Sequence, residues 1–149
     1  MDVFAQQKFA GNQATVAVYT KKVADEMMLQ IAQELNVKEI CFISAEPNEK
    51  NAYRTQIFTP TKEITFSGHI LLATAYVINH FLVPSQLSEI KLQLNNGEIT
   101  INSRNLPSDG KFAFISKHKP VFFSDQGKPE FGKTFDRVLL ARILNLEVA

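Results

Sequence analysis

The segment from Ile70 to Leu82, ILLATAYVINHFL, constrains the fold of this chain more than any other stretch. Its strongly polar side chains are Thr74, Asn79 and His80, so no wide hydrophilic face is left for water. A helix that is apolar nearly all round must be buried nearly all round. The run is too short for a membrane span, which needs about 20 apolar residues. The sequence therefore predicts a helix enclosed by the rest of the domain.

The chain enters this helix through Phe66-Ser67-Gly68-His69. An enclosed helix that opens at a glycine directs free N–H groups and the positive end of its dipole at whatever lies there. Such an end is a ready place for a carboxylate ligand. Two interpretations stay open: an anion site that includes Gly68 and His69, or a core helix with a solvated cap.

Composition excludes several classes of function. With 149 residues, the chain has room for one domain, which we place at 1–149. The net charge is +1 with acids and bases interspersed, so no nucleic-acid partner is expected. A lone cysteine, Cys41, excludes an internal disulfide, and the 3 histidines lack metal-ligand spacing, so we predict no metal. The N-terminus has no signal-peptide pattern; we expect a cytoplasmic protein without a membrane partner.

Hydrophobic patterns give the expected order of elements. In chain order we predict strands at Met1–Phe4 and Ala14–Tyr19, a helix at Val23–Leu35, strands at Val37–Ser44 and Ala52–Thr59, the buried helix, a hairpin, strands at Lys111–Ser116 and Val121–Phe123, and a last helix from Thr134 to about Leu146. Antiparallel strands wrapped around one apolar helix satisfy this order best, which gives an α+β domain.

The hairpin is the clearest local signal, with Asn96-Gly97 suited to a type I′ turn. That turn would pair Leu94 with Ile99 and Leu92 with Ile101, on one face of the sheet.

Glu39 is the sharpest candidate for chemistry. Alternation along its predicted strand puts Val37, Glu39, Cys41 and Ile43 on one side. A carboxyl group on that otherwise apolar side would be desolvated and suited to passing protons near neutral pH. The alternative is a solvated glutamate at the frayed start of the strand. Cys41, among apolar neighbours, is expected to be a small buried hydrophobe.

Two further positions invite both a functional and a structural interpretation. His69 could hydrogen-bond an anionic substrate or shuttle a proton, or it could simply occupy the first helical turn. Gly11-Asn12 could hold a ligand through backbone amides and the Asn side chain. Equally, the stretch could be a plain turn, because Gly and Asn tolerate positive φ.

Four stretches in series resemble a known family. They are DVFAQQKFAGNQATV with its Gly-Asn turn, LNVKEICF with its glutamate, YRTQIFTPTKEITFSGH with its Gly-His step, and ILLATAYVI. In this order they resemble the N-terminal half of the phenazine-biosynthesis PhzF-like proteins, which share the diaminopimelate epimerase fold. The likeness is good over about residues 2 to 82 and looser beyond.

The resemblance implies a mixed, mainly antiparallel β-barrel around a central buried helix. It maps the family's acid/base glutamate onto Glu39 and its substrate-contacting step onto Gly68 and His69. The family's Gly-Asn turn falls on Gly11 and Asn12. Enzymes of the family are isomerases that move a proton on a small carboxylated molecule without a cofactor.

Departures from the family matter as much. Family chains have two similar domains with the active site between them, and an aspartate of the second domain completes that site. This sequence corresponds to the first of the two domains. Gln13 and Thr65 replace prolines, and Ile70-Leu71 replaces a small or proline residue and a threonine. Two functions follow: a cofactor-independent isomerase whose site is completed in a homodimer, or a non-enzymatic binding protein or remnant that kept the fold without a complete site.

Overall fold

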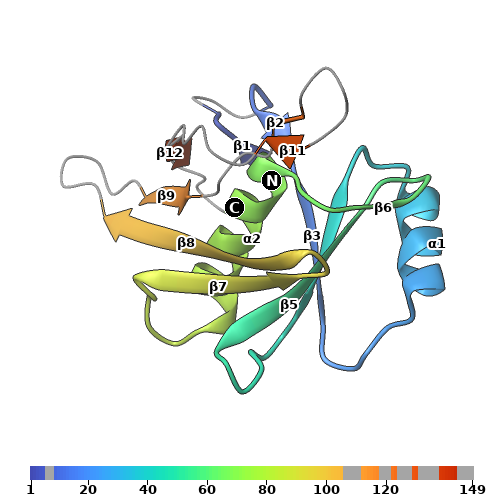
Figure 1. Ribbon diagram of the computed structural model, residues 1–149, viewed down its shortest axis with the longest axis horizontal. Coiled ribbons are helices and arrows are strands. Elements are labelled where there is room, and N and C mark those ends of the chain that lie inside the picture. Colours follow the sequence, from blue (N-terminus) through green and yellow to red (C-terminus); the bar gives the residue numbers. More distant parts are fainter. Residues whose placement is uncertain (6–8, 106–111, 118–121, 124–128, 131–137, 144–149) are drawn as a thin grey trace.

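The computed structural model describes residues 1–5, 9–105, 112–117, 122–123, 129–130 and 138–143, with side chains through residue 103. A mixed sheet dominates them (Figure 1). Its strands are β3 (Thr15–Tyr19), β4 (Ile40–Ser44), β5 (Ala52–Phe58), β6 (Glu63–Ile64), β7 (Glu89–Leu94), β8 (Gly97–Asn105), β9 (Phe112–Lys117) and β12 (Val138–Ile143).

Most neighbouring strands of the sheet are antiparallel. The order across it is β12-β9-β8-β7-β5-β4-β3, with β6 beside β5; the pairs β3–β4 and β5–β7 are parallel. Two short antiparallel pairs lie outside this sheet, β1 (Asp2–Val3) with β2 (Asn12–Gln13) and β10 (Phe122–Phe123) with β11 (Pro129–Glu130). The fold is therefore mixed α/β with a mostly antiparallel sheet.

The predicted buried helix is present. It comprises α2 (Gly68–Val77) and a π-helical segment, η1 (Ile78–Leu82), in which the N–H of Val83 donates to the carbonyl of Ile78 at 3.2 Å. Every side chain from Ile70 to Tyr76 is buried, and α2 packs with inward residues of β4, β5, β7 and β8 in one core cluster. Val77 is half-buried, and full exposure is reached near the end of η1, where Phe81 is 59% exposed. No helix in the described ranges is long and apolar enough to cross a membrane.

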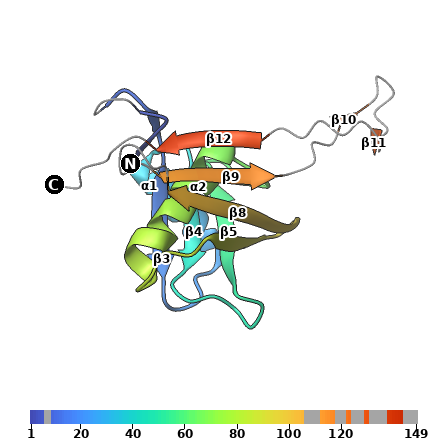
Figure 2. The ribbon, with the colours of Figure 1, turned by 90° about the vertical axis from the view of Figure 1, so that its left-hand side faces the viewer.

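The sheet is open as far as its described residues pair. Strands β12 and β3 form its two ends, so a closed barrel is not confirmed. Helix α2 nevertheless touches both ends, because it contacts β3 and β4 on one side and β9 and β12 on the other. Figure 2 shows β8, β9 and β12 stacked beside α2.

Helix α1 (Asp25–Leu35) covers the other face of the sheet, as Figure 1 shows. It buries Met28 and Ala32 in a second core cluster, and it ends at Leu35 as predicted, with Asn36 at φ 48° as the C-cap. Val37 also packs on this second cluster, whereas Cys41 and Ile43 face α2. The predicted alternation therefore does not extend back to Val37, because β4 begins only at Ile40.

The predicted last helix is wrong. Over Val138–Ile143 the chain forms β12, which pairs antiparallel with β9 from Val138↔Lys117 to Ile143↔Phe112. Leu and Ala in this stretch favour a helix locally, but a neighbouring strand offers a full ladder of backbone hydrogen bonds, and tertiary context overrides propensity. The rest of the predicted helix, 134–137 and 144–146, lies outside the described residues.

The hairpin exists, but its register is shifted by two residues. Leu92 pairs with Ile99 and Leu94 with Gly97, so the two loop residues are Asn95 and Asn96. Gly97, with φ 141°, lies in the strand and not in the turn. The side chain of Asn95 is held by Arg54, which donates to its Oδ1, and by Glu63, which accepts from its Nδ2 at 2.5 Å. A shift of two keeps each side chain on its predicted face.

Candidate active site

The carboxyl group of Glu39 lies at the N-terminal end of α2. Glu39 directly precedes β4, yet its side chain is only 17% exposed. Its Oε2 accepts a hydrogen bond of 2.5 Å from the hydroxyl of Ser67. The same oxygen lies 3.8 Å from Nε2 of His69. The structure thus brings together the predicted residues Glu39 and His69, and it does so through Ser67.

Ser67 leaves the first turn of α2 open. It is the N-cap residue, in extended conformation, but its side chain makes no cap hydrogen bond because the hydroxyl is directed to Glu39. The N–H of Leu71 donates to the carbonyl of Ser67 at 3.0 Å. The N–H groups of Gly68, His69 and Ile70 precede this bond and have no carbonyl partner within the helix. Together with the helix dipole they place positive potential beside Glu39.

His69 adds a second polar atom to this end of the helix. Its side chain is 12% exposed, and its Nδ1 lies 3.3 Å from the hydroxyl of Ser67. Its Nε2 is buried and has no hydrogen-bond partner among the described residues. An unpaired buried nitrogen next to a carboxylate is costly unless a ligand completes it. His69 is therefore a first-turn residue whose buried, unpaired Nε2 lies beside the Glu39 carboxylate.

The bulky residues after His69 do not fill the helix mouth. Ile70 is 0% exposed and Leu71 is 1% exposed, and both belong to the core cluster around α2. The hydroxyl group at this end of the helix comes instead from Ser67.

Gly11 and Asn12 lie at the same end of the molecule, where β1 and β2 sit near the start of α2 (Figure 1). No hydrogen bond among the described residues joins either of them to Glu39, Ser67 or His69. A Cβ on Gly11 would lie 2.7 Å from the carbonyl oxygen of Val3, so close backbone approach requires this glycine. Positive φ, which the sequence suggested for Gly11 and Asn12, occurs at the neighbouring Phe9.

Ser67 is a functional candidate that was not predicted from the sequence. Its position offered a signal, because serine is a preferred N-cap and lies two residues before His69. The prediction for Cys41 is confirmed: it is fully buried, and burial raises the pKa of its thiol to about 12. Among residues with described side chains, no group of three or more His, Cys, Asp or Glu lies together as metal ligands would.

Comparison with known proteins identifies the family. The family model PhzC-PhzF, described as phenazine biosynthesis-like protein, matches residues 1–140. The chain belongs to this family. A putative PhzC/PhzF protein of Clostridium difficile has a similar structure, with a TM-score of 0.64 and 30% identity over 84% of this chain and 46% of that one.

Curated members of the PhzC/PhzF family are similar in sequence. An uncharacterized isomerase of Clostridium acetobutylicum is 30% identical over 99% of this chain and 46% of its own length. A trans-2,3-dihydro-3-hydroxyanthranilate isomerase of Pseudomonas aeruginosa is 29% identical over 81% of this chain and 41% of its own. This PhzC/PhzF chain therefore spans less than half the length of the curated relatives it matches.

Proposed function

We propose that this chain is a PhzF-type isomerase that moves a proton on a small carboxylated metabolite in the cytoplasm. The arrangement of Glu39, Ser67 and His69 at the open N-terminus of α2 carries the proposal. The isomerase names of its relatives in Clostridium acetobutylicum and Pseudomonas aeruginosa support the reaction class.

In this proposal Glu39 is the general acid/base. Its carboxylate removes a proton from a carbon of the substrate and returns it to another carbon, so the reaction is an isomerisation with no net oxidation or reduction. Ser67 positions the carboxylate through its 2.5 Å hydrogen bond. The substrate carboxylate binds the free N–H groups at Gly68 and His69. Gly11 and Asn12 border the substrate at the start of β2, and no cofactor takes part.

We also propose that the sheet curls around α2 as a barrel and that a homodimer completes the site. Contacts of α2 with strands from both ends of the sheet support the first part. The homodimer is supported by the comparison with relatives, because this chain matches less than half of the length of each of them. A two-fold pairing of identical chains would supply the second wall of the cleft.

Deuterium exchange tests the proposal. The protein is incubated in heavy water with a panel of small carboxylates that includes trans-2,3-dihydro-3-hydroxyanthranilate, and incorporation is followed by mass spectrometry. We expect exchange with wild type, a loss of at least about a hundredfold with Glu39→Gln, and no change with Glu34→Gln, an exposed acid on α1. Exchange at the buffer rate across the panel would refute catalysis. Light scattering tests the dimer, for which the mass should be twice the 16.8 kDa of one chain.

A non-enzymatic binding protein is the second candidate. Ile70 and Leu71, both buried in the core, supply no hydroxyl beside His69. Binding of a carboxylate that depends on His69 but gives no exchange with any substrate would favour this candidate.

A further inference from the structure

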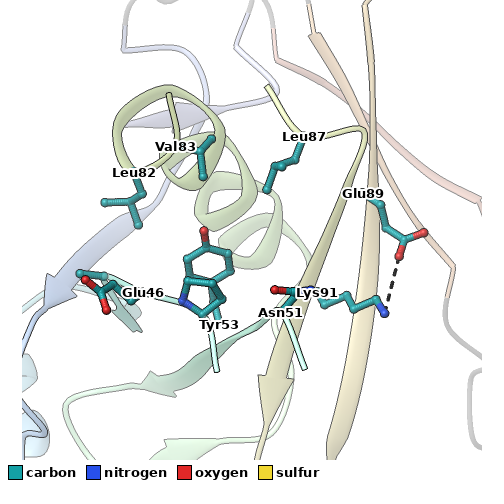
Figure 3. Close-up of a pocket in the computed structure, with 10 residues that line it drawn as sticks. Glu46, Asn51, Tyr53, Leu82, Val83, Leu87, Glu89 and Lys91 are labelled. Carbon is teal, nitrogen blue, oxygen red and sulfur yellow. Dashed lines mark ion pairs between the residues drawn. The ribbon is translucent and has the colours of Figure 1, made fainter. Parts of the chain in front are cut away.

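A cavity of about 640 Å³ lies at the opposite end of the buried helix from Glu39 (Figure 3). Its walls come from the turn after β4, from Tyr53 on β5, from the end of η1 with the segment that follows, and from β7. The 10 residues of α2 and 5 residues of η1 separate the two ends by about 20 Å at 1.5 Å per residue. One small molecule cannot reach both ends, so this cavity is separate from the candidate active site.

Tyr53 supplies a polar group to the wall of the cavity. The residue is 4% exposed, and its hydroxyl makes no hydrogen bond with any described residue. Figure 3 shows this hydroxyl directed toward the space bordered by Leu82, Val83 and Leu87. Burial raises the pKa of Tyr53, so the group stays neutral at physiological pH and can both donate and accept. The hydroxyl is not one of the buried side-chain atoms that lack a partner, so it remains in contact with solvent in the cavity and is accessible to a ligand there.

Asparagine side chains fix both rims of the cavity. On one rim, Oδ1 of Asn48 accepts from the N–H groups of Lys50 and Ala52, at 2.9 and 3.1 Å. On the other, Asn79 bonds both the N–H and the carbonyl of Leu87, at 2.8 and 3.0 Å. The cavity is therefore preformed, and its volume falls in the range of about 300–1,000 Å³ that is usual for small-molecule sites.

The charges around the cavity favour a cation. Glu46 has no ion-pair partner among the described residues, whereas Glu89 and Lys91 pair with each other at 3.9 Å. The lining thus carries one uncompensated negative charge. The C-terminal end of η1, at Leu82, also borders the cavity, and the end of a helix attracts cations.

We propose that this cavity binds a small organic amine with an apolar body. The ammonium group is shared between the Tyr53 hydroxyl, which accepts, and the Glu46 carboxylate. The apolar body lies against Leu82, Val83 and Leu87. The proposal stands apart from the isomerase reaction, whose ligand carries the opposite charge and binds at the other end of the helix.

Isothermal titration calorimetry with three probes of similar shape tests the proposal: phenethylamine, the neutral phenethyl alcohol and the anionic hydrocinnamate. We expect phenethylamine to bind at least about tenfold more tightly than hydrocinnamate. Glu46→Gln should weaken the binding of phenethylamine by about tenfold and leave the binding of phenethyl alcohol unchanged, because this substitution removes only the negative charge. Tyr53→Phe should weaken the binding of phenethylamine and of phenethyl alcohol by about threefold to tenfold, because it removes the hydroxyl.

Glu49→Gln is the matched control, since Glu49 is an exposed acid on the same turn and does not line the cavity. It should bind phenethylamine as wild type does. Chemical-shift changes on titration should centre on Tyr53, Leu82 and Leu87. The proposal is overturned if hydrocinnamate binds as tightly as the amine, if Glu46→Gln has no effect, if no probe binds, or if the shifts centre on Glu39 and His69.

Discussion

Asn79 is the residue whose replacement should most directly test how the helix end is held. Its side chain is 3% exposed, and its two hydrogen bonds join η1 to Leu87 in the segment before β7. Asn79→Ala removes both bonds. It also leaves the N–H and the carbonyl of Leu87 without partners in a partly buried place.

The expected cost follows from these contacts. Each hydrogen bond contributes about 1 kcal/mol net, and a buried polar group left unpaired costs about 1–3 kcal/mol. Leu87 is only partly buried, so water restores some of what is lost. We therefore expect the free energy of unfolding to fall by about 2–4 kcal/mol, a large part of the 5–15 kcal/mol that is usual for a domain.

Urea denaturation followed by circular dichroism measures this loss. With a slope of about 2 kcal/mol per molar, the midpoint should fall by about 1–2 M. Hydrogen exchange gives a local measure, because the amide of Leu87 should lose its protection. Asn96→Ala is the control: this exposed asparagine in the hairpin loop makes no hydrogen bond with described residues, so its loss should change stability by less than about 0.5 kcal/mol.

The role of the two Asn79 hydrogen bonds is refuted if Asn79→Ala lowers the free energy of unfolding by less than about 1 kcal/mol and the amide of Leu87 stays as protected from exchange as in wild type. That result would mean that packing alone, and not the Asn79 side chain, holds the segment after η1.

Three further predictions concern the other end of the helix and the core. Gly11→Ala should cost about 1–3 kcal/mol in urea unfolding, because its Cβ would lie 2.7 Å from the carbonyl of Val3; an unchanged midpoint would contradict this. Ser67→Ala should slow deuterium exchange by about tenfold to a hundredfold, since it frees the Glu39 carboxylate, and a wild-type rate would exclude a positioning role. Cys41 keeps its proton to about pH 12 when folded, whereas the unfolded thiol ionises near pH 9. Between pH 9 and pH 12 the free energy of unfolding of wild type should therefore fall by up to about 1.4 kcal/mol per pH unit more than that of Cys41→Ala. If the free energies of the two proteins change in parallel over this range, the raised pKa of Cys41 is disproved.

The sequence predicts best where a pattern leaves the chain one physical option. A helix without a polar face has to be buried, and Ile70 to Tyr76 are buried. Glu39 bonds Ser67 at the start of α2, on the side that Cys41 and Ile43 face, but it precedes β4, and Val37 packs on the opposite side, so strand alternation accounts only for the residues from Ile40 onward. Ser67 was not predicted as a functional residue, because a serine before a helix ordinarily caps the helix. Here its hydroxyl instead donates a hydrogen bond to Glu39.

Prediction failed where distant partners decide the outcome. Val138–Ile143 reads locally as a helix and becomes a strand because β9 pairs with it. The hairpin turn shifted because Arg54 and Glu63, both far away in sequence, bind Asn95. The cavity at Tyr53 gave no sequence signal, since its walls come from four separate parts of the chain.

The π-helical end of the buried helix has a consequence for how the length of this chain can vary. Segment η1 carries one residue more than an α-helical turn would, with Val83 bonded back to Ile78. Deleting the exposed Phe81 would let this turn tighten to α geometry and absorb the loss locally. Deleting a residue within α2 would instead rotate all that follows by about 100° and turn core side chains outward. Natural variants that are one residue shorter should therefore have their gap in η1 and not in α2.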